Sequence, residues 1–143
     1  NYRMDDIRAS IGIVQLDKLP KDLNIRAEIR SHYENRLEEI GEIIVPFKGY
    51  KYFSSNYIFP IILKNSTVEK RNHVREHLAT AGIQTSVHYP AVHRFSIYKE
   101  FAVPLPKTEY VADNLITLPM FSKLTPEQID YICDTLKEAV RSV

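Results

Sequence analysis

The sequence predicts an α+β domain in which a small antiparallel sheet is covered by helices. Two amphipathic helical stretches open the chain and a well-capped helix closes it, while short β-branched runs lie between them as hairpin-like neighbours. With 143 residues, 44% of them hydrophobic, the chain has the length and apolar content for one core. Since no repeat, low-complexity stretch or long linker divides it, residues 1–143 are expected to form a single domain.

The first third of the chain has the periodicity of two helices. Apolar residues share one face of residues 4–19, and Pro20 is expected to stop or bend that helix. A second apolar flank indicates that it is covered on two sides, like a connector between two masses. The second helix, over about 22–40, should end at Gly41 in a left-handed cap. The stripe residues are Met4, Ile7, Ile11 and Val14 in the first helix, and Ile25, Ile29, Tyr33, Leu37 and Ile40 in the second.

The middle of the chain carries strand signals on both sides of a helix. Pro60 has no N–H to donate, so its strand is expected at a sheet edge or with a bulge. Ser66 and Glu69 have the spacing of a capping box at the start of the helix, and Gly82 is placed to end it. The expected elements are, in order, strands at 43–45 and 52–63, a helix over about 67–81, and a strand at 83–89.

The last third of the chain is expected to be a loop followed by a short strand and a long helix. Thr125 is predicted to cap that helix, Pro126 suits its first position, and Gln128 completes a capping box. Its buried stripe is predicted to be Ile129, Ile132, Cys133, Leu136 and Val140. The elements before it are, in order, an ordered loop at 90–108 with a helical turn at 95–101, a turn at 109–114, and a strand at 115–118.

Composition excludes several kinds of partner and site. The net charge is only +1, with both signs scattered along the chain, so we expect binding neither to nucleic acid nor to a membrane surface. No stretch is apolar enough to span a membrane, and no signal segment leads the chain. Cys133 is the single cysteine, which excludes an intrachain disulfide and suits a reducing cytoplasm. The four glycines form no phosphate-binding loop, so we expect a main phosphate site to come from elsewhere in a longer polypeptide.

A zinc-protease motif is present in the segment HVREH at residues 73–77. Its two histidines, four residues apart on a helix, could hold Zn²⁺ with Glu76 as general base, which would make the chain a zinc hydrolase. The sequence singles out no third ligand, and the guanidinium groups of Arg71 and Arg75 would oppose a dication. We favour the alternative that His73 and His77 are two solvated residues on an amphipathic helix.

Two other clusters concentrate functional groups. His88, Tyr89 and His93 follow a predicted strand into a loop, where functional side chains are often displayed, although the rings could equally pack the loop against the sheet. Asn1, Tyr2 and Arg3 precede the first helix, whose free N–H groups and dipole favour an anion.

Three segments together resemble the small domain of the DegT/StrS-type sugar aminotransferases. NYRMDDIRASIGIVQLDKLP is similar to the segment that begins that domain. GIQTSVHYPAVH, followed by Tyr98, is similar to the family's Gly-Ile, strand, His-Tyr-Pro, His and later Tyr. LITLPMFSKLTPEQIDYICDTLKEAV is similar to the closing segment. The three matches have the family's order and spacing over nearly the whole chain, so they are more specific together than alone.

The resemblance implies the C-terminal small domain of a fold-type I pyridoxal-phosphate enzyme, cytoplasmic and homodimeric, whose large domain precedes this chain. It implies transfer of an amino group, from glutamate or another donor, to a keto-sugar that is usually nucleotide-linked, in polysaccharide or antibiotic sugar biosynthesis. In such enzymes pyridoxal 5'-phosphate is the electron sink and the protein supplies placement and charge. The Schiff-base lysine belongs to the large domain, so no catalytic residue is expected in this chain, and the chain alone is expected to be inactive.

The resemblance also assigns roles to individual residues. Asn1 matches the family asparagine that reaches the cofactor phosphate of the partner subunit. His88, Tyr89 and His93 match residues near the substrate entrance. Arg3 matches in sequence, with its role left open. Some relatives replace the lysine with histidine and dehydrate the sugar, and that position lies outside this chain. A non-catalytic interaction module that retains the domain's shape is a further alternative.

Overall fold

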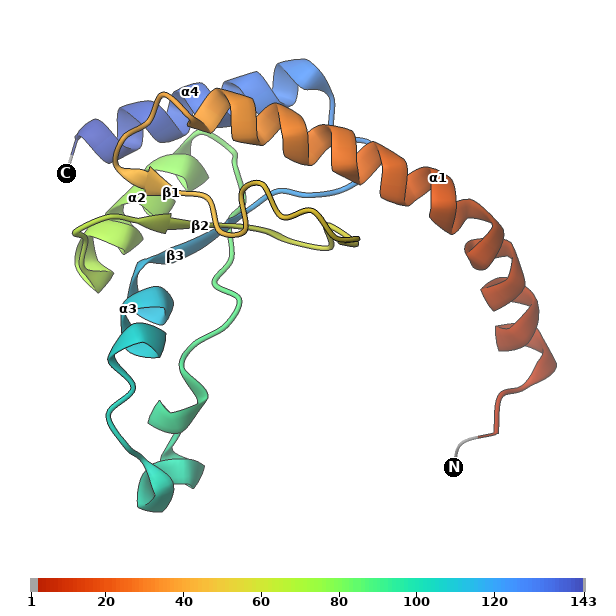
Figure 1. Ribbon diagram of the computed structural model, residues 1–143, viewed down its shortest axis with the longest axis horizontal. Helices are drawn as coiled ribbons and strands as arrows, with labels where there is room; N and C mark the ends of the chain where they lie inside the picture. The colour runs from red at the N-terminus through yellow and green to blue at the C-terminus, as the bar shows by residue number, and fades with distance from the viewer. Residues whose placement is uncertain (1–2, 143) are drawn as a thin grey trace.

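The computed structural model describes residues 3–142 and shows an α+β domain, as the sequence predicts. Asn1, to which the resemblance gives a role, lies outside the described residues. The elements are, in order, α1 (Asp6–Leu37), β1 (Ile43–Ile44), β2 (Phe59–Leu63), α2 (Val68–Thr80), the 3-10 turns η1 (Val92–Arg94) and η2 (Ser96–Phe101), α3 (Pro106–Asn114), β3 (Leu115–Leu118) and α4 (Pro126–Arg141). Figure 1 shows α4 beside the second half of α1, with α2 close to the sheet.

The sheet has three antiparallel strands in the order β1-β2-β3. The strand with Pro60 is therefore central, whereas the sequence favoured an edge or a bulge. Both backbone hydrogen bonds of Thr117, the residue paired with Pro60, go to Ser86 on the far side of β3. The backbone of Pro60 thus faces the β1 side of the sheet, where β1 reaches only Ile62 and Leu63. Proline is tolerated because no neighbouring strand needs its missing N–H.

The core joins the second half of α1 to the sheet and to α4. Tyr33 and Phe59 are fully buried, and their rings stack with centroids 4.6 Å apart and planes inclined by 15°. The Tyr33 hydroxyl donates a hydrogen bond to the Pro119 carbonyl at 3.0 Å, which links α1 to the segment that follows β3. In the stripe predicted over residues 25–40, Ile25 is partly buried and the other four residues are buried. The predicted stripe of α4 is buried except for the partly buried Val140.

The first helix differs from the prediction because it continues through Pro20 as one helix of 32 residues. Proline removes a single N–H from the helix interior, and the helix curves instead of ending. In Figure 1 the first half of α1 bends away from the rest of the domain. The apolar side chains of residues 4–19, expected to be covered on two sides, are exposed in this chain: Met4, Ile7, Ile11, Ile13, Val14, Leu16 and Leu19.

Several boundaries were mispredicted. Residues 52–58 are not a strand, since Asn56 takes a left-handed conformation with φ of 47° and the strand begins only at Phe59. The expected strand at 83–89 is reduced to a single bridge at Ser86. Thr67, not Ser66, caps α2, because its side chain accepts the Lys70 N–H. The predicted capping box of α4 is confirmed, with Thr125 and Gln128 each accepting the other's backbone N–H.

The Tyr33 hydroxyl allows a direct test of how α1 is fixed. Tyr33→Phe removes the bond to the Pro119 carbonyl but keeps the ring stack, so urea unfolding should show about 1–2 kcal/mol lower stability. Tyr57→Phe, which removes a hydroxyl from an exposed ring, is the matched control and should change stability by less than about 0.5 kcal/mol. Equal stability of Tyr33→Phe and the unaltered chain would show that the bond contributes nothing.

Candidate functional site

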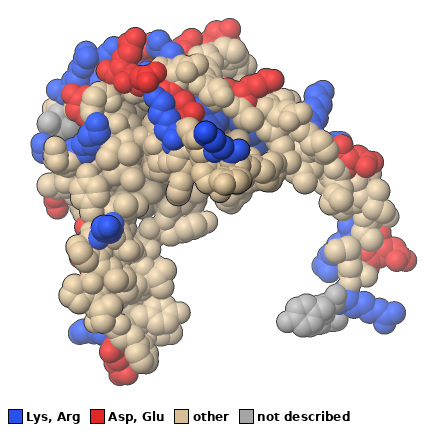
Figure 2. Space-filling model, viewed as in Figure 1, with Lys and Arg blue, Asp and Glu red and all other residues tan. Residues whose placement is uncertain are grey.

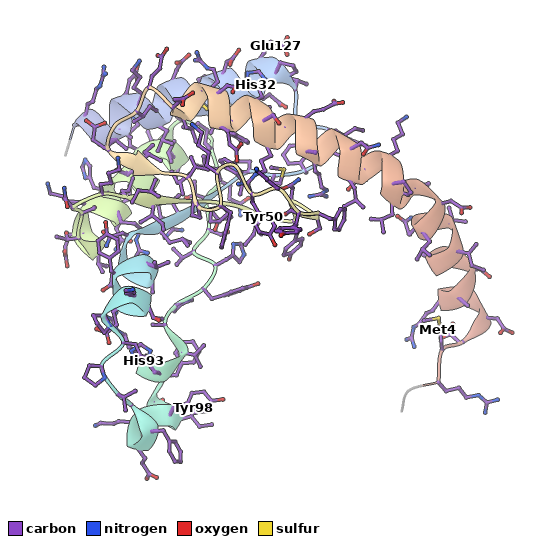
Figure 3. The ribbon with its side chains drawn as sticks, in the orientation of Figure 1. Met4, His32, Tyr50, His93, Tyr98 and Glu127 are labelled. Carbon is purple, nitrogen blue, oxygen red and sulfur yellow. The ribbon has the colours of Figure 1, made fainter. Side chains whose placement is uncertain are left out.

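One cleft is lined by the two histidines and the tyrosine that were predicted to lie near the substrate. Its volume is about 770 Å³. It lies along residues 89–114, which we call the arm and which project from the sheet in Figure 1. His88, Tyr89 and His93 all line it, as does Tyr98, which Figure 3 places near the far end of the arm. The structure therefore brings together the residues that the sequence grouped from 88 to 98.

His88 and Tyr89 meet where the chain leaves the sheet for the arm. Their rings contact edge to face, with centroids 4.9 Å apart. The Tyr89 side chain is 67% exposed, so its ring is available to a ligand or to another domain. His88 is partly buried, and its Nδ1 atom has no hydrogen-bond partner within residues 3–142. The pair therefore offers the open aromatic face of Tyr89, and the contact with substrate predicted for His88 and Tyr89 stays a prediction.

His93 is turned toward the interior of the arm. Its Nε2 atom lies 3.0 Å from Glu109 Oε1, and its side chain is only 14% exposed. The same carboxylate oxygen accepts the backbone N–H of Leu105 at 2.9 Å. One oxygen thus joins η1, the loop before α3, and α3 itself. These contacts make His93 a residue that holds the arm together, and its predicted contact with substrate stays a prediction.

An ion-pair cluster that the sequence did not reveal stabilises the arm next to His93. Arg94 pairs through both terminal nitrogens with Asp113, one contact being 3.1 Å, and its Nη2 lies 3.4 Å from Glu109 Oε2. The pKa of Glu109 is lowered, first by the Leu105 N–H and then by His93 and Arg94. The partners are 15 to 19 positions apart in sequence, so no local pattern announces them.

The start of α1 offers less to an anion than the sequence indicated. Asp5 caps the helix, and its carboxylate accepts the Arg8 N–H at 2.8 Å. A side-chain anion therefore already occupies part of the helix N-terminus. Asn1 is outside the described residues, so its predicted contact with a cofactor phosphate remains a prediction.

The alternative sites proposed from sequence receive no support. His73 is exposed and His77 half-buried on α2, and residues 3–142 contain no group of three His, Cys, Asp or Glu side chains placed to hold a metal ion. Cys133 is buried, as predicted, and burial raises the pKa of its thiol to about 12, as expected for an inert core residue. No helix within the described residues is long and apolar enough to cross a membrane.

Charged side chains are unevenly distributed over the face that Figure 2 shows. Figure 2 shows acidic and basic side chains crowded on the outer side, over α4 and the second half of α1. The hollow between the arm and the first half of α1 is bordered mainly by uncharged surface. Exposed apolar side chains come from α1, from the arm, and from the loop at 45–58, which carries Phe47, Tyr50, Tyr52, Phe53 and Tyr57. So much exposed apolar surface is typical of an interface.

Glu109 can be tested as the residue that ties the arm. Glu109→Gln keeps an acceptor but removes its charge, so the Leu105 amide should exchange roughly fivefold faster at neutral pH. Glu100→Gln, at an exposed position of η2, should leave that exchange unchanged. Because folding lowers the pKa of Glu109, its stabilisation is complete at neutral pH and is lost as the pH falls through the lowered value. Unaltered exchange in Glu109→Gln would remove the carboxylate from this role.

Comparison with known proteins shows which family this chain resembles. The model of the DegT/DnrJ/EryC1/StrS aminotransferase family matches residues 1–137. The dTDP-4-dehydro-2,3,6-trideoxy-D-glucose 4-aminotransferase of Saccharopolyspora spinosa is 31% identical over 95% of this chain and 34% of its own length. The GDP-perosamine synthase of Escherichia coli O157:H7 is 30% identical over 96% of this chain and 37% of its own.

Solved structures agree with the fold. S. venezuelae DesV is similar with a TM-score of 0.86 and 26% identity, over 99% of this chain and 38% of that one. Helicobacter pylori PseC, an aminotransferase of pseudoaminic acid biosynthesis, has a TM-score of 0.92 at 24% identity, over 100% of this chain and 39% of that one, which shows the fold alone. The chain thus spans a little over a third of the length of these relatives. The chain belongs to the DegT/DnrJ/EryC1/StrS aminotransferase family.

Proposed function

We propose that this chain is the C-terminal small domain of a pyridoxal-phosphate-dependent aminotransferase that transfers an amino group from glutamate to a nucleotide-linked keto-sugar. The observation that carries the proposal is the family match over residues 1–137. It is supported by two relatives that are named as an aminotransferase and a transaminase of nucleotide sugars, of which this chain covers 34% and 39%. The remaining length of such a relative is enough for a large domain.

The uncharged hollow supports a second domain packed against this one. Apolar side chains of the first half of α1, such as Ile7 at 74% exposure, have no cover within residues 3–142. Burying apolar surface contributes roughly 25 cal/mol per Å², so a domain that fits the hollow would be held strongly. We assign this face to the large domain and, through the homodimer, to the partner subunit.

The residues of this chain fit a supporting role toward the cofactor. Every lysine is exposed apart from the partly exposed Lys137, whereas a lysine that binds pyridoxal phosphate covalently needs a desolvated site that lowers its pKa. We therefore place the Schiff-base lysine in the large domain. Asn1 would donate its side-chain N–H to the phosphate of the cofactor bound by the partner subunit. The cofactor, when bound, supplies the electron sink of the reaction.

His88 and Tyr89 would act on the substrate by position. Tyr89 presents an open ring at the point where the arm leaves the sheet, and the His88 ring contacts it edge to face. Held there, they can orient the sugar and keep water away from it. His93 would act indirectly, since its contact with Glu109 fixes the arm that carries Tyr89.

Two other functions are less well supported. A dehydratase of the same family differs at the lysine position, which lies outside this chain. The family match alone does not separate the two reactions, and amino transfer is favoured because relatives are named as an aminotransferase and a transaminase. A non-catalytic interaction module would retain the fold without the chemistry. The single buried cysteine fits a cytoplasmic enzyme.

The proposed reaction can be tested on the full-length protein. With pyridoxal phosphate, glutamate and a nucleotide-linked 4-keto-6-deoxyhexose, it should produce the amino sugar and one equivalent of 2-oxoglutarate. Omitting glutamate is the control and should stop both products. Loss of water from the sugar without consumption of glutamate would identify the dehydratase, and no reaction with any nucleotide-linked keto-sugar would favour the interaction module.

Asn1 can be tested separately in the same full-length enzyme. One hydrogen bond to a charged group contributes roughly 1.5–3 kcal/mol, so Asn1→Ala should weaken cofactor binding by about tenfold to somewhat over a hundredfold. Turnover should largely recover at saturating cofactor. Asn35→Ala, at an exposed position of α1, is the matched control and should bind as the unaltered enzyme does. Unchanged affinity in Asn1→Ala, titrated at fixed ionic strength, would show that Asn1 is not a phosphate ligand.

A further inference from the structure

Two arginines of α2 contact the chain at the two ends of the arm. Arg71 and Arg75 are four positions apart, so their side chains share one face of the helix. Helix α2 also packs against α3, the last element of the arm. Neither arginine lines the arm cleft formed by residues 3–142, and the proposed function gives neither of them a role. Their contacts indicate what they do.

Arg75 binds the segment that leads into the arm. Its Nε atom donates to Thr85 Oγ1 and its Nη2 atom to the Thr85 carbonyl, both at 3.2 Å. Because the guanidinium group is planar and rigid, two such bonds fix both the distance and the orientation of the segment. The next residue, Ser86, exchanges both backbone hydrogen bonds with Thr117 of β3. The start of the arm is therefore fixed between α2 and β3.

Arg71 binds the other end of the arm. It is 9% exposed, and it donates from Nη1 to the Ala112 carbonyl at 3.4 Å and from Nε to Asn72 Oδ1 at 2.9 Å. Ala112 lies in the last turn of α3, where carbonyls lack partners within the helix and the helix dipole favours a cation. The pKa of Arg71 is lowered, first by burial and then by Arg75, while Asp113 raises it. A buried guanidinium stays charged and needs such partners, and here the end of the arm supplies them.

The two ends fixed in this way carry residues that line the arm cleft. Ala112 lines the cleft directly, and so do His88 and Tyr89, which follow Thr85 closely in the chain. Since the Tyr89 side chain is largely exposed, few contacts of its own fix it, and the backbone that leads to it sets its position. Misplacing a group that orients a substrate by about 1 Å can slow a reaction about a hundredfold. The relative positions of these lining residues thus depend on contacts made by α2.

The ion pairs inside the arm act differently. Arg94 pairs with Glu109 and Asp113, which joins one part of the arm to another. These pairs would keep the shape of the arm even if it turned relative to the sheet. The arginines of α2 join the arm to the rest of the domain instead, together with the Tyr110 hydroxyl, which donates to the Leu63 carbonyl at 3.4 Å. Loss of either arginine should therefore affect where the arm lies more than its internal contacts.

We propose that Arg71 and Arg75 are positioning residues for the keto-sugar, because they fix the two ends of the arm to α2 and thereby place Tyr89 and the arm cleft against the substrate. The proposal rests on the proposed function for the identity of that substrate. Arg75 acts at the start of the arm and Arg71 at its end. Both act through the arm, so neither is a catalytic residue.

The first test is amide hydrogen exchange in the full-length enzyme, with the variants Arg75→Met and Arg71→Met. Residues 83–88 should exchange roughly two- to tenfold faster in Arg75→Met, and residues 110–114 in Arg71→Met, as expected for the loss of a hydrogen bond. Residues 96–105 should exchange as before, because the ion pairs inside the arm remain. Lys70→Met removes an exposed charge from the same helix and is the matched control, which should leave all three segments unchanged.

The second test separates a positioning role from a merely structural one. Glutamate gives up its nitrogen before the sugar receives it, so kcat/KM for each substrate reports its own half of the reaction. Both variants should lower kcat/KM for a nucleotide-linked keto-sugar roughly two- to tenfold and leave kcat/KM for glutamate unchanged, while Lys70→Met should change neither. Arg75 is only partly buried, so its variant remains decisive where removal of the buried Arg71 prevents folding.

Three results would overturn the proposal: unchanged exchange at both ends of the arm, an equal fall of kcat/KM for glutamate and for the keto-sugar, or an unchanged kcat/KM for the keto-sugar although the ends exchange faster. An unaltered enzyme that aminates no keto-sugar would instead contradict the proposed function. The exchange measurement needs no turnover, so it would still decide whether the two arginines fix the arm.

Discussion

The stack of Tyr33 on Phe59 determines how the parts of this domain are arranged. It fixes the second half of α1 to the central strand, and the Tyr33 hydroxyl extends the connection to Pro119, at the start of the segment leading to α4. Because α1 is held only through this half, its continuation through Pro20 carries the first half away from the sheet. The arm extends from the sheet on the other side of the domain, and Figure 2 shows the hollow between these two projections. The open face thus follows from one anchored ring pair and one unbroken helix.

Much of the fold could be predicted from local sequence signals. The stripe containing Ile29 and Tyr33 and the capping box of Thr125 depend on spacings of three or four residues, which a sequence displays directly. The errors arose where distant contacts decide. Pro20 stays within a helix, and Pro60 lies in a central strand because β1 is too short to need its N–H. Neither property can be inferred from the residues adjacent to the prolines.

The candidate site was predictable in outline only. The sequence placed His88, Tyr89 and His93 together, and the structure shows that they line one cleft. It did not show that His93 contacts Glu109 or that Arg71 contacts Ala112, because those pairs are 16 and 41 positions apart. The family match is the basis of the proposed function. The structure adds that the Tyr89 ring is exposed and that His93 contacts Glu109 within the arm.

The central claim is that the hollow receives the domain that binds the cofactor. Amide hydrogen exchange over residues 6–20, compared between this chain and the full-length enzyme, tests it most directly, because packing against the exposed side of α1 would restrain its opening. The account predicts much slower exchange over these residues in the full-length enzyme, and little change over α4, whose charged side lies outside the hollow. Equal exchange over residues 6–20 in the two proteins would contradict it.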